Sequence, residues 1–104
     1  MTSTPLVSVV CASYNMGQYV GEAVDSVLAQ DYPALEMIVV DDGSTDDTQQ
    51  RLARFAGDAR VKVIRQENQG QTVAKNRGLK EATGDLIGFC DADNRWMPGK
   101  LARQ

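Results

Sequence analysis

Apolar runs alternate along the chain with segments in which apolar residues recur every three or four positions. The first run, LVSVVCA at 6–12, is short and rich in β-branched residues, which predicts a strand. The segment that follows has helical spacing over about 17–30. Its apolar positions are Val20, Ala23, Val24, Val27 and Leu28. The chain is therefore predicted to begin with a strand and an amphipathic helix.

The same alternation continues to the last residue. Further strands are predicted at 36–40 (EMIVV), 61–64 (VKVI) and 86–90 (LIGFC). Further helices are predicted from Ser44 through Leu52, Phe55 and Ala56, over 71–82, and within 94–104. Ser44 and Asp47, three positions apart, have the character of a capping box that opens the second helix.

Strands that alternate with helices predict an α/β fold, with a Rossmann-like, mostly parallel sheet of four main strands and helices on both faces. The runs 6–12, 36–40 and 86–90 are almost continuously apolar, which is typical of strands covered on both faces. Lys62 and Arg65 instead make 61–64 the predicted edge strand. We expect residues 1–104 to form one domain, truncated at its C-terminus, because the alternation stops within its last helix.

Composition excludes several classes of function. A net charge of −3 argues against a nucleic-acid-binding protein. The chain has no histidine, which excludes Ser–His, Cys–His and His–metal chemistry within it. Cys11 and Cys90 lie in apolar runs, so we expect buried thiols rather than a disulfide or a metal pair. Without a signal-peptide pattern or an apolar run of spanning length, we expect a cytoplasmic protein, peripheral to the inner face of the membrane in its full-length form.

Polar or acidic residues follow every predicted strand. The four segments are SYN, DDGS, ENQG and DADN. In open α/β sheets, ligands bind at the carboxyl ends of the strands. These four segments are therefore the predicted ligand-binding edge.

Asp91 and Asp93 lie two positions apart where the fourth strand ends. In an extended segment, residues i and i+2 point to the same side. Two carboxylates so placed repel each other unless a cation lies between them, and Mg²⁺ or Mn²⁺ is commonly held by one or two carboxylates with substrate phosphates. The alternative is a solvated turn that caps the next helix.

The ends of the first two strands offer groups that suit a base or a sugar. Asp42 projects at the tip of the second strand, where its carboxylate can accept a hydrogen bond, although helix capping is the alternative. Tyr14 presents a flat ring suited to stacking on a base, and an ordinary loop or core aromatic is the alternative. Asn15 is interpreted as a turn former or helix cap rather than a ligand contact.

Lys75 and Arg77 follow the start of the helix at 71–82 and are the predicted phosphate partners in an acidic domain. Solvated surface cations are an equally good interpretation of both. The sequence has neither a G-x-G-x-x-G fingerprint nor a P-loop motif.

Taken together, these segments resemble the N-terminal, nucleotide-sugar-binding half of a family 2 glycosyltransferase with the GT-A fold. The matching stretches are VSVVCASYNMGQYVGEAVDSVLAQDYPALEMIVVDDGSTDDT, NQGQTVAKNRGLKEATGD and IGFCDADNRWMPGKL. The resemblance implies transfer of a sugar from a nucleoside-diphosphate donor, with a UDP-sugar favoured, to a hydroxyl of a glycan, lipid or other acceptor. It also implies inversion at the anomeric carbon.

The resemblance implies a role for each matching position. Tyr14 stacks on the base and Asp42 hydrogen-bonds it. Asp41 supports that site, and Ala12 belongs to it. Asp91-Ala92-Asp93 matches the DxD motif, which contacts the donor and holds the diphosphate through Mg²⁺ or Mn²⁺; Asp93 is the stronger metal candidate and Asp91 the second. Lys75, where the family commonly has arginine, or its neighbour Arg77 contacts the diphosphate.

The sequence departs from the family near Cys11, where proline is frequent, and at Asn94, where aspartate is common. The family's general base is expected beyond Gln104, so we expect no catalytic residue in this chain and donor binding without transfer.

Two other functions fit the residues less fully. One is a Mg²⁺-dependent phosphohydrolase or phosphotransferase with an aspartate nucleophile, and the other is a non-catalytic nucleotide-binding or assembly module. An exposed edge on the fourth strand would also favour a homo-oligomer.

Overall fold

The computed structural model describes residues 5–30 and 32–92. Its elements are β1 (Val7–Ser13), α1 (Gly17–Leu28), β2 (Leu35–Asp42), α2 (Thr48–Leu52), the 3₁₀ turn η1 (Ala53–Phe55), β3 (Val61–Gln66), α3 (Gln71–Glu81) and β4 (Leu86–Phe89). No helix in this described part is long and apolar enough to cross a membrane. Asp93, Asn94 and the helix predicted within 94–104 lie outside the described residues.

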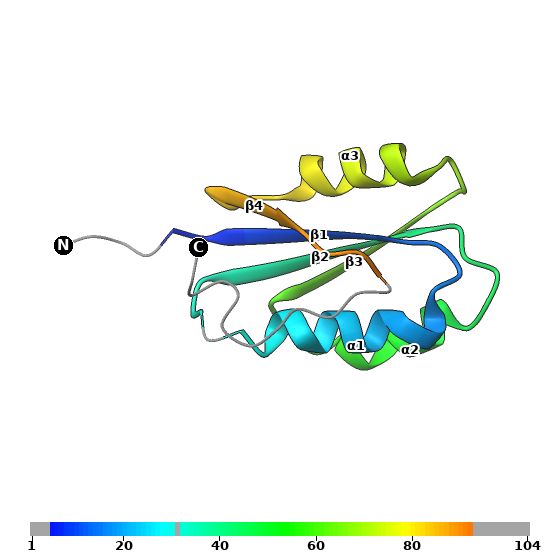
Figure 1. Cartoon of the computed structure of the whole chain (residues 1–104), viewed down its shortest axis with the longest axis horizontal. Coiled ribbons are helices and arrows are strands. Elements are labelled where there is room, and N and C mark those ends of the chain that lie inside the picture. Colours follow the sequence, from blue (N-terminus) through cyan, green and yellow to red (C-terminus); the bar gives the residue numbers. More distant parts are fainter. Residues whose placement is uncertain (1–4, 31, 93–104) are drawn as a thin grey trace.

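The four strands form one parallel sheet in the order β3-β2-β1-β4. β1 is therefore central, with Val7 paired to Leu35 on one side and to Leu86 on the other. Helices α1 and α2 cover one face of the sheet, and α3 covers the opposite face (Figure 1). This arrangement confirms the predicted α/β fold and places β3 at an edge, as Lys62 and Arg65 indicated.

The larger hydrophobic core lies between the sheet and helices α1 and α2. Helix α1 contributes the apolar positions predicted from its spacing: Val20, Ala23, Val24 and Val27 are fully buried. A smaller cluster of Ile38, Val40 and Ala74 lies under α3. Gly78 allows α3 to approach the sheet closely, because a Cβ atom there would lie 2.4 Å from Val10 Cγ1. The core thus fixes both helical layers against the central strands.

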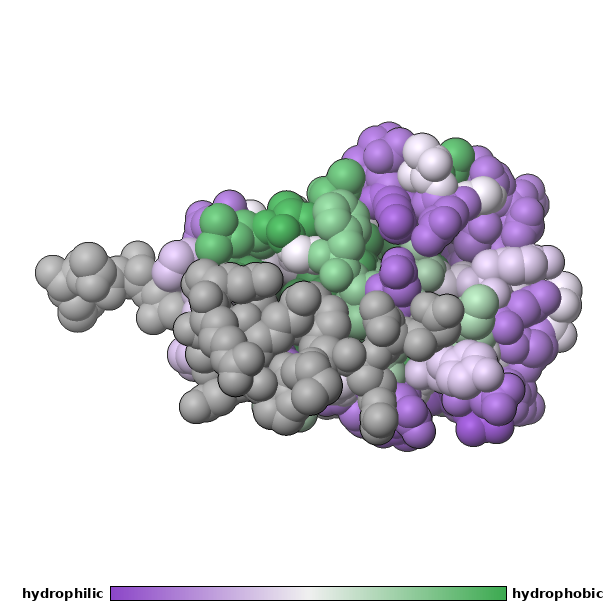
Figure 2. Space-filling model, viewed as in Figure 1, coloured by the Kyte–Doolittle hydropathy of each residue, from purple (hydrophilic) through white to green (hydrophobic). Residues whose placement is uncertain are grey.

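The prediction that the fourth strand is buried on both faces is wrong. β4 hydrogen-bonds to β1 alone among the described strands, and Leu86, Ile87 and Phe89 are 53%, 42% and 47% exposed. Their side chains form an apolar patch at one edge of the molecule (Figure 2). An apolar run identifies a strand, but it carries no information about which elements cover that strand.

The predicted capping box of Ser44 and Asp47 is also wrong. Helix α2 begins at Thr48, and neither its N-cap residue Asp47 nor Ser44 caps it through a side chain. Ser44 instead accepts the backbone N–H of Asn15 at 2.9 Å. The polar segment after β2 is therefore used to join two loops rather than to start a helix at Ser44.

The two cysteines are buried, as predicted, and form no disulfide. Both belong to the larger core cluster, Cys11 from β1 and Cys90 from the residue after β4. Their burial supports the interpretation of structural thiols.

Candidate functional site

A cavity of about 460 Å³ opens at the carboxyl edge of the sheet, where the loops after all four strands meet. It is lined by Ala12, Ser13, Tyr14, Met16, Asp42, Asn68, Gly70, Gln71, Asp91 and Ala92. In Figure 1 this edge is on the right, where β1, β2 and β3 end. The cavity therefore lies where the polar segments of the sequence predicted a ligand site, and five of the predicted donor-binding residues line it.

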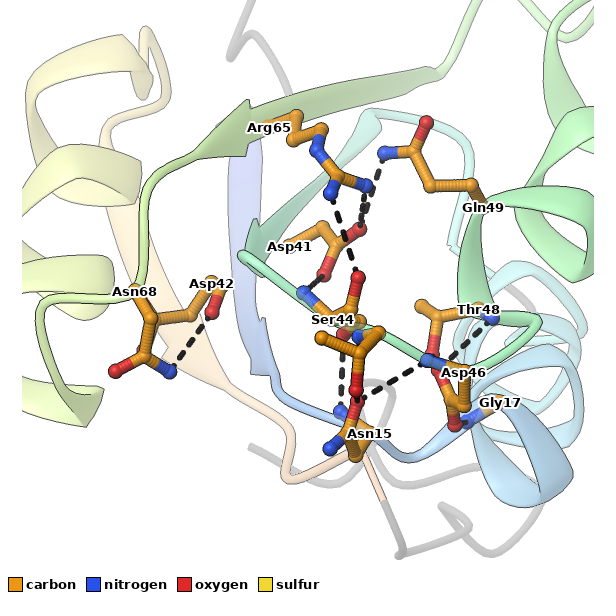
Figure 3. Close-up of polar contacts among 11 residues, drawn as sticks. Asn15, Gly17, Asp41, Asp42, Ser44, Asp46, Thr48, Gln49, Arg65 and Asn68 are labelled. Atoms are coloured by element: carbon orange, nitrogen blue, oxygen red, sulfur yellow. Dashed lines mark hydrogen bonds and ion pairs between the residues drawn. The ribbon is translucent and has the colours of Figure 1, made fainter.

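The loop after β1 presents Tyr14 to the cavity, with 45% of its surface exposed. The next residue, Asn15, adopts a left-handed φ of 52°, which asparagine tolerates better than most residues. Its side-chain oxygen accepts N–H groups of Thr45 at 2.8 Å and Asp46 at 3.3 Å (Figure 3). Asn15 is thus a turn former, as predicted, and it also fastens the loop that carries Tyr14 to the loop after β2.

Asp42 lies at the tip of β2, only 3% exposed, and lines the cavity. Its carboxylate accepts the Gln66 amide at 2.9 Å and the N–H groups of Gln69 at 2.9 Å and Gly70 at 3.0 Å. Burial acts to raise the pKa of Asp42, but these hydrogen bonds together outweigh it and lower the pKa below 3.8. The carboxylate is therefore ionised, and it holds the β3–α3 loop against the strand end.

Asp41 points to the opposite side of β2 from Asp42 (Figure 3), because consecutive strand residues alternate. It is fully buried and accepts the Ser44 N–H at 3.0 Å and the Gln49 amide at 3.0 Å. The Arg65 guanidinium lies 3.5 Å away on the same carboxylate. Asp41 is absent from the residues that line the cavity. Its contacts order the end of β2 on the side opposite Asp42.

Asp46 is a positioning residue that sequence reasoning missed. One carboxylate oxygen accepts the Gly17 N–H at the start of α1 at 3.0 Å, and the other accepts the Thr48 N–H at the start of α2 at 3.0 Å (Figure 3). The Thr48 hydroxyl also donates to it, and this bond is the main reason that the pKa of Asp46 is lowered. The spacing D-x-T is a sequence pattern for such a turn, which the neighbouring Ser44 and Asp47 obscured.

Asp91 follows β4 with an exposed side chain and lines the cavity together with Ala92. Its predicted partner Asp93 lies outside the described residues. Within residues 5–30 and 32–92 there is no group of three His, Cys, Asp or Glu side chains that could hold a metal ion. A divalent cation at Asp91 would therefore need oxygen ligands from a bound substrate or from residues outside the described part.

Lys75 and Arg77 are not among the described residues that line the cavity. The ammonium of Lys75 lies 5.8 Å from the centre of the Phe89 ring, on the side of α3 next to β4. Arg77 lies 3.7 Å from Glu81 one helical turn further along α3. Their contact with a diphosphate stays a prediction.

Five further lining residues were not named individually in the sequence prediction. Ser13, Asn68 and Gly70 lie in the predicted segments SYN and ENQG, and Met16 and Gln71 lie just outside them. Asn68 also donates its side-chain amide to the Asp42 backbone oxygen at 3.1 Å. Gly70 has a φ of 102° and forms the N-cap of α3. ENQG was recognised as a loop after a strand, but its spacing alone does not say which of its side chains reach the cavity.

Comparison with known proteins gives a family and a set of related folds. Residues 8–104 match the model of glycosyl transferase family 2. The chain is 44% identical over 102 residues to the putative teichuronic acid biosynthesis glycosyltransferase TuaG of Bacillus subtilis, covering 96% of this chain and 40% of that protein.

Two solved structures share the fold. The mannosyltransferase PcManGT of Pyrobaculum calidifontis, in complex with GDP-Man and Mn²⁺, has a TM-score of 0.88 and 34% identity, covering 97% of this chain and 31% of that one. S. aureus TarS in complex with UDP-GlcNAc has a TM-score of 0.87 and 32% identity, covering 94% of this chain and 29% of that one. The chain thus spans less than half the length of these relatives.

Proposed function

The chain belongs to glycosyl transferase family 2 and has part of the GT-A fold, and we propose that its cavity binds the nucleoside-diphosphate sugar of a glycosyltransferase reaction. The observation that carries this proposal is the meeting of Tyr14, Asp42 and Asp91 at one cavity, although they come from the carboxyl ends of three different strands. An aromatic ring and a buried acceptor suit the base of such a donor, and an exposed carboxylate suits its diphosphate. The family match argues against the phosphohydrolase alternative.

The base is proposed to stack on Tyr14 beside Asp42. The Tyr14 ring is half exposed and its loop is fastened by Asn15, so the stacking surface is already in place. The carboxylate of Asp42 already accepts hydrogen bonds from the β3–α3 loop. A base that reaches Asp42 therefore binds against an ordered loop. The solved relatives are complexes with GDP-Man and UDP-GlcNAc, so the proposal includes both guanine and uracil as the base.

The diphosphate is proposed to bind at Asp91 with Mg²⁺ or Mn²⁺. An exposed carboxylate that lines the cavity fits a hard divalent cation, provided that phosphate oxygens complete its ligands. Asp93, the stronger metal candidate in the sequence, is proposed as a second protein ligand. Asp91 and Asp93 would hold such an ion, and the chemistry it would supply is neutralisation of the charge that develops on the diphosphate leaving group.

The full protein is proposed to transfer the sugar to an acceptor hydroxyl with inversion, and residues 1–104 to be its donor-binding domain. Tyr14 orients the base, Asp42 orders the loop beside it, and Asp91 holds the diphosphate end. A base that deprotonates the acceptor is proposed to lie outside this chain, because an inverting displacement requires one next to the nucleophile.

Isothermal titration of the full-length protein with UDP, GDP and their sugars, with and without Mn²⁺, tests this function. We expect one nucleotide to bind, and to bind more tightly when Mn²⁺ is present. Asp91→Asn should remove most of the Mn²⁺-dependent gain, whereas Glu22→Gln, an equal charge change on the exposed side of α1, should not. A folded protein that binds none of these ligands in the presence of Mn²⁺ would contradict the proposal.

A further inference from the structure

Glu36, near the start of β2, lies at the opposite end of the sheet from the cavity. A single carboxylate oxygen, Oε2, accepts the hydroxyl of the fully buried Ser8 and, from Thr83, the backbone N–H at 2.8 Å and the hydroxyl at 3.0 Å. Burial acts to raise the pKa of Glu36, but these hydrogen bonds, with the charge of Lys62, together lower it by more, so the carboxylate is ionised. Hydrogen bonds to an ionised acceptor are stronger than those between neutral groups. Glu36 therefore joins β1 to the turn that leads from α3 into β4.

Gly84 adds a further link between this turn and β1. Its N–H donates to the Ser8 hydroxyl at 2.8 Å. A Cβ atom at Gly84 would lie 2.4 Å from Ser8 Oγ and 2.7 Å from the Leu6 carbonyl oxygen, so only glycine allows so close an approach. The next residue, Asp85, donates its N–H to that same oxygen at 2.8 Å. We call Ser8, Glu36, Thr83 and Gly84 the amino-end cluster, which is separate from the described residues that line the cavity.

β4 depends on contacts outside the strand for its register, because its own side chains specify that register weakly. Three of its four residues have large exposed side chains, and the fourth is Gly88. Register is strongly specified where one face of a strand is buried. After the strand, the small side chains of Cys90 and Ala92 are buried in the larger core cluster. The register of β4 is therefore held by the amino-end cluster before the strand and by these two residues after it.

The register of β4 decides where Asp91 points. Asp91 lies between the buried Cys90 and Ala92 and lines the cavity. A slip of one residue would exchange the two faces, which would turn Asp91 toward the core and its two neighbours toward solvent. The amino-end cluster opposes such a slip, because one of its members, Ser8, pairs with Ile87 in the sheet. Asp91 follows further along the same short segment, roughly 13 Å from Ile87 in an extended chain.

We propose that Glu36 is a positioning residue for Asp91: through the amino-end cluster it fixes the register of β4 and thereby the place of Asp91 at the cavity. This assignment rests on the proposed function for the role of Asp91, which is to hold the diphosphate with a divalent cation. The hold on β4 itself is a property of the ligand-free protein. The assignment therefore has one consequence that is measured without a ligand and one that is measured with it.

Amide hydrogen exchange in the ligand-free full-length protein tests the hold on β4. The reporter is the Cys90 N–H, which donates to the Val10 carbonyl oxygen at 3.1 Å, one residue before Asp91. Thr83→Val removes the hydroxyl that donates to Glu36 but keeps the size of the side chain, whereas Thr83→Ser keeps the hydroxyl. We expect exchange at Cys90 to be about threefold faster in Thr83→Val, the size of one hydrogen bond, and close to wild type in Thr83→Ser. Exchange in the middle of β2 should be unchanged in both variants.

Titration with UDP or GDP, whichever one binds, with and without Mn²⁺, tests the effect on Asp91. Glu36→Ala removes the acceptor that the three donors share. We expect it to reduce the Mn²⁺-dependent gain in affinity about threefold, as when Asp91 is in place in about a third of the molecules, and to leave the affinity without Mn²⁺ unchanged. Arg54→Ala is the matched control, because it also removes three hydrogen bonds, to Asp25 and Gly21 of α1, but away from β4. It should leave both affinities unchanged.

The outcomes distinguish this assignment from the function on which it rests. Equal exchange at Cys90 in the wild type and in Thr83→Val would overturn the assignment, and so would a Glu36→Ala protein that keeps the full Mn²⁺-dependent gain or loses affinity equally with and without Mn²⁺. If Glu36→Ala does not fold, Ser8→Ala takes its place with the same expectation. Failure of the wild type to bind any nucleotide, or to gain affinity from Mn²⁺, overturns the proposed function instead. Exchange at Cys90 then still decides whether the amino-end cluster holds β4.

Discussion

The side-chain oxygen of Asn15 accepts the Thr45 N–H at 2.8 Å, although 30 positions separate the two residues in the sequence. The bond joins the loop after β1 to the loop after β2, and the Asn15 N–H adds a second link by donating to Ser44 Oγ. Asp46 continues this junction into the first turns of α1 and α2. The side of the cavity that carries Tyr14 is therefore ordered before any ligand is present.

Asn15→Ala and Asn15→Gly separate the two contributions of this residue. Both variants lose the side-chain acceptor, but only alanine must also adopt the left-handed φ of 52° with a Cβ atom. We expect Asn15→Ala to lower the free energy of unfolding by about 2 to 3 kcal/mol, and Asn15→Gly by roughly 1 kcal/mol less. Urea denaturation of both variants measures the difference. Equal losses would show that the backbone conformation at residue 15 costs nothing.

Tyr14→Ala tests the proposed stacking on the base. Stacking of a base on an aromatic ring is worth about 1 to 3 kcal/mol, so we expect nucleotide binding to weaken by roughly tenfold, with Tyr14→Phe close to the wild type. Tyr19→Ala is the matched control, because Tyr19 is 46% exposed against 45% for Tyr14 but does not line the cavity. Titration calorimetry checks all three variants, and an equal effect of Tyr14→Ala and Tyr19→Ala would contradict the stacking role.

The lowered pKa of Asp42 predicts how stability depends on pH. Burial acts to raise the pKa of Asp42, but the hydrogen bonds from Gln66, Gln69 and Gly70 together lower it by more, so the pKa in the folded protein lies below the ordinary value of an aspartate. The unfolded chain therefore takes up the proton at higher pH than the folded one. The stability that the ionised carboxylate provides is complete above about pH 5 and is lost as the pH falls below about 4, through the folded pKa.

Asp42→Asn shows this dependence directly. We expect the variant to be less stable than the wild type by about 2 kcal/mol at pH 7, because an amide nitrogen cannot accept the loop N–H groups. The gap should narrow between pH 5 and pH 3 in urea unfolding curves. A gap that stays constant over this range would mean that another group, such as Glu36 with its own lowered pKa, carries the acid dependence.

The apolar edge at β4 predicts self-association of residues 1–104 when they are prepared alone. Leu86, Ile87 and Phe89 present no charge at this edge, whereas the β3 edge carries Lys62 and Arg65, and such charges discourage strand pairing. We expect Ile87→Lys to shift the chain toward monomer in sedimentation experiments. Val63→Lys, on the already charged edge, should change little. A wild-type chain that remains monomeric at high concentration would contradict the prediction.

The sequence predicted the strands, the first and third helices and the ligand-binding edge, because these depend on local patterns. Helical spacing is plain in α1, where the apolar positions are Val20, Ala23, Val24 and Val27. The β-branched runs of β1 and β2 favour strands over helices. The burial of β4 was mispredicted because it depends on which elements pack against that strand, and the sequence of the strand does not specify them. Asp46 was missed for a related reason: it matters through its hydrogen bonds to the first residues of α1 and α2, which only the folded chain reveals.

β4 has four residues, pairs with β1 alone among the described strands and leaves three large apolar side chains exposed. Little free energy therefore holds it, and it should open locally while β1, β2 and the helices remain folded. Asp91 leaves the cavity whenever that happens, so the affinity for the proposed nucleotide would include the free energy of closing the strand. Bound nucleotide should accordingly slow amide exchange along β4 more than along β2. The exchange rate of β4 amides would then show whether the cavity is occupied.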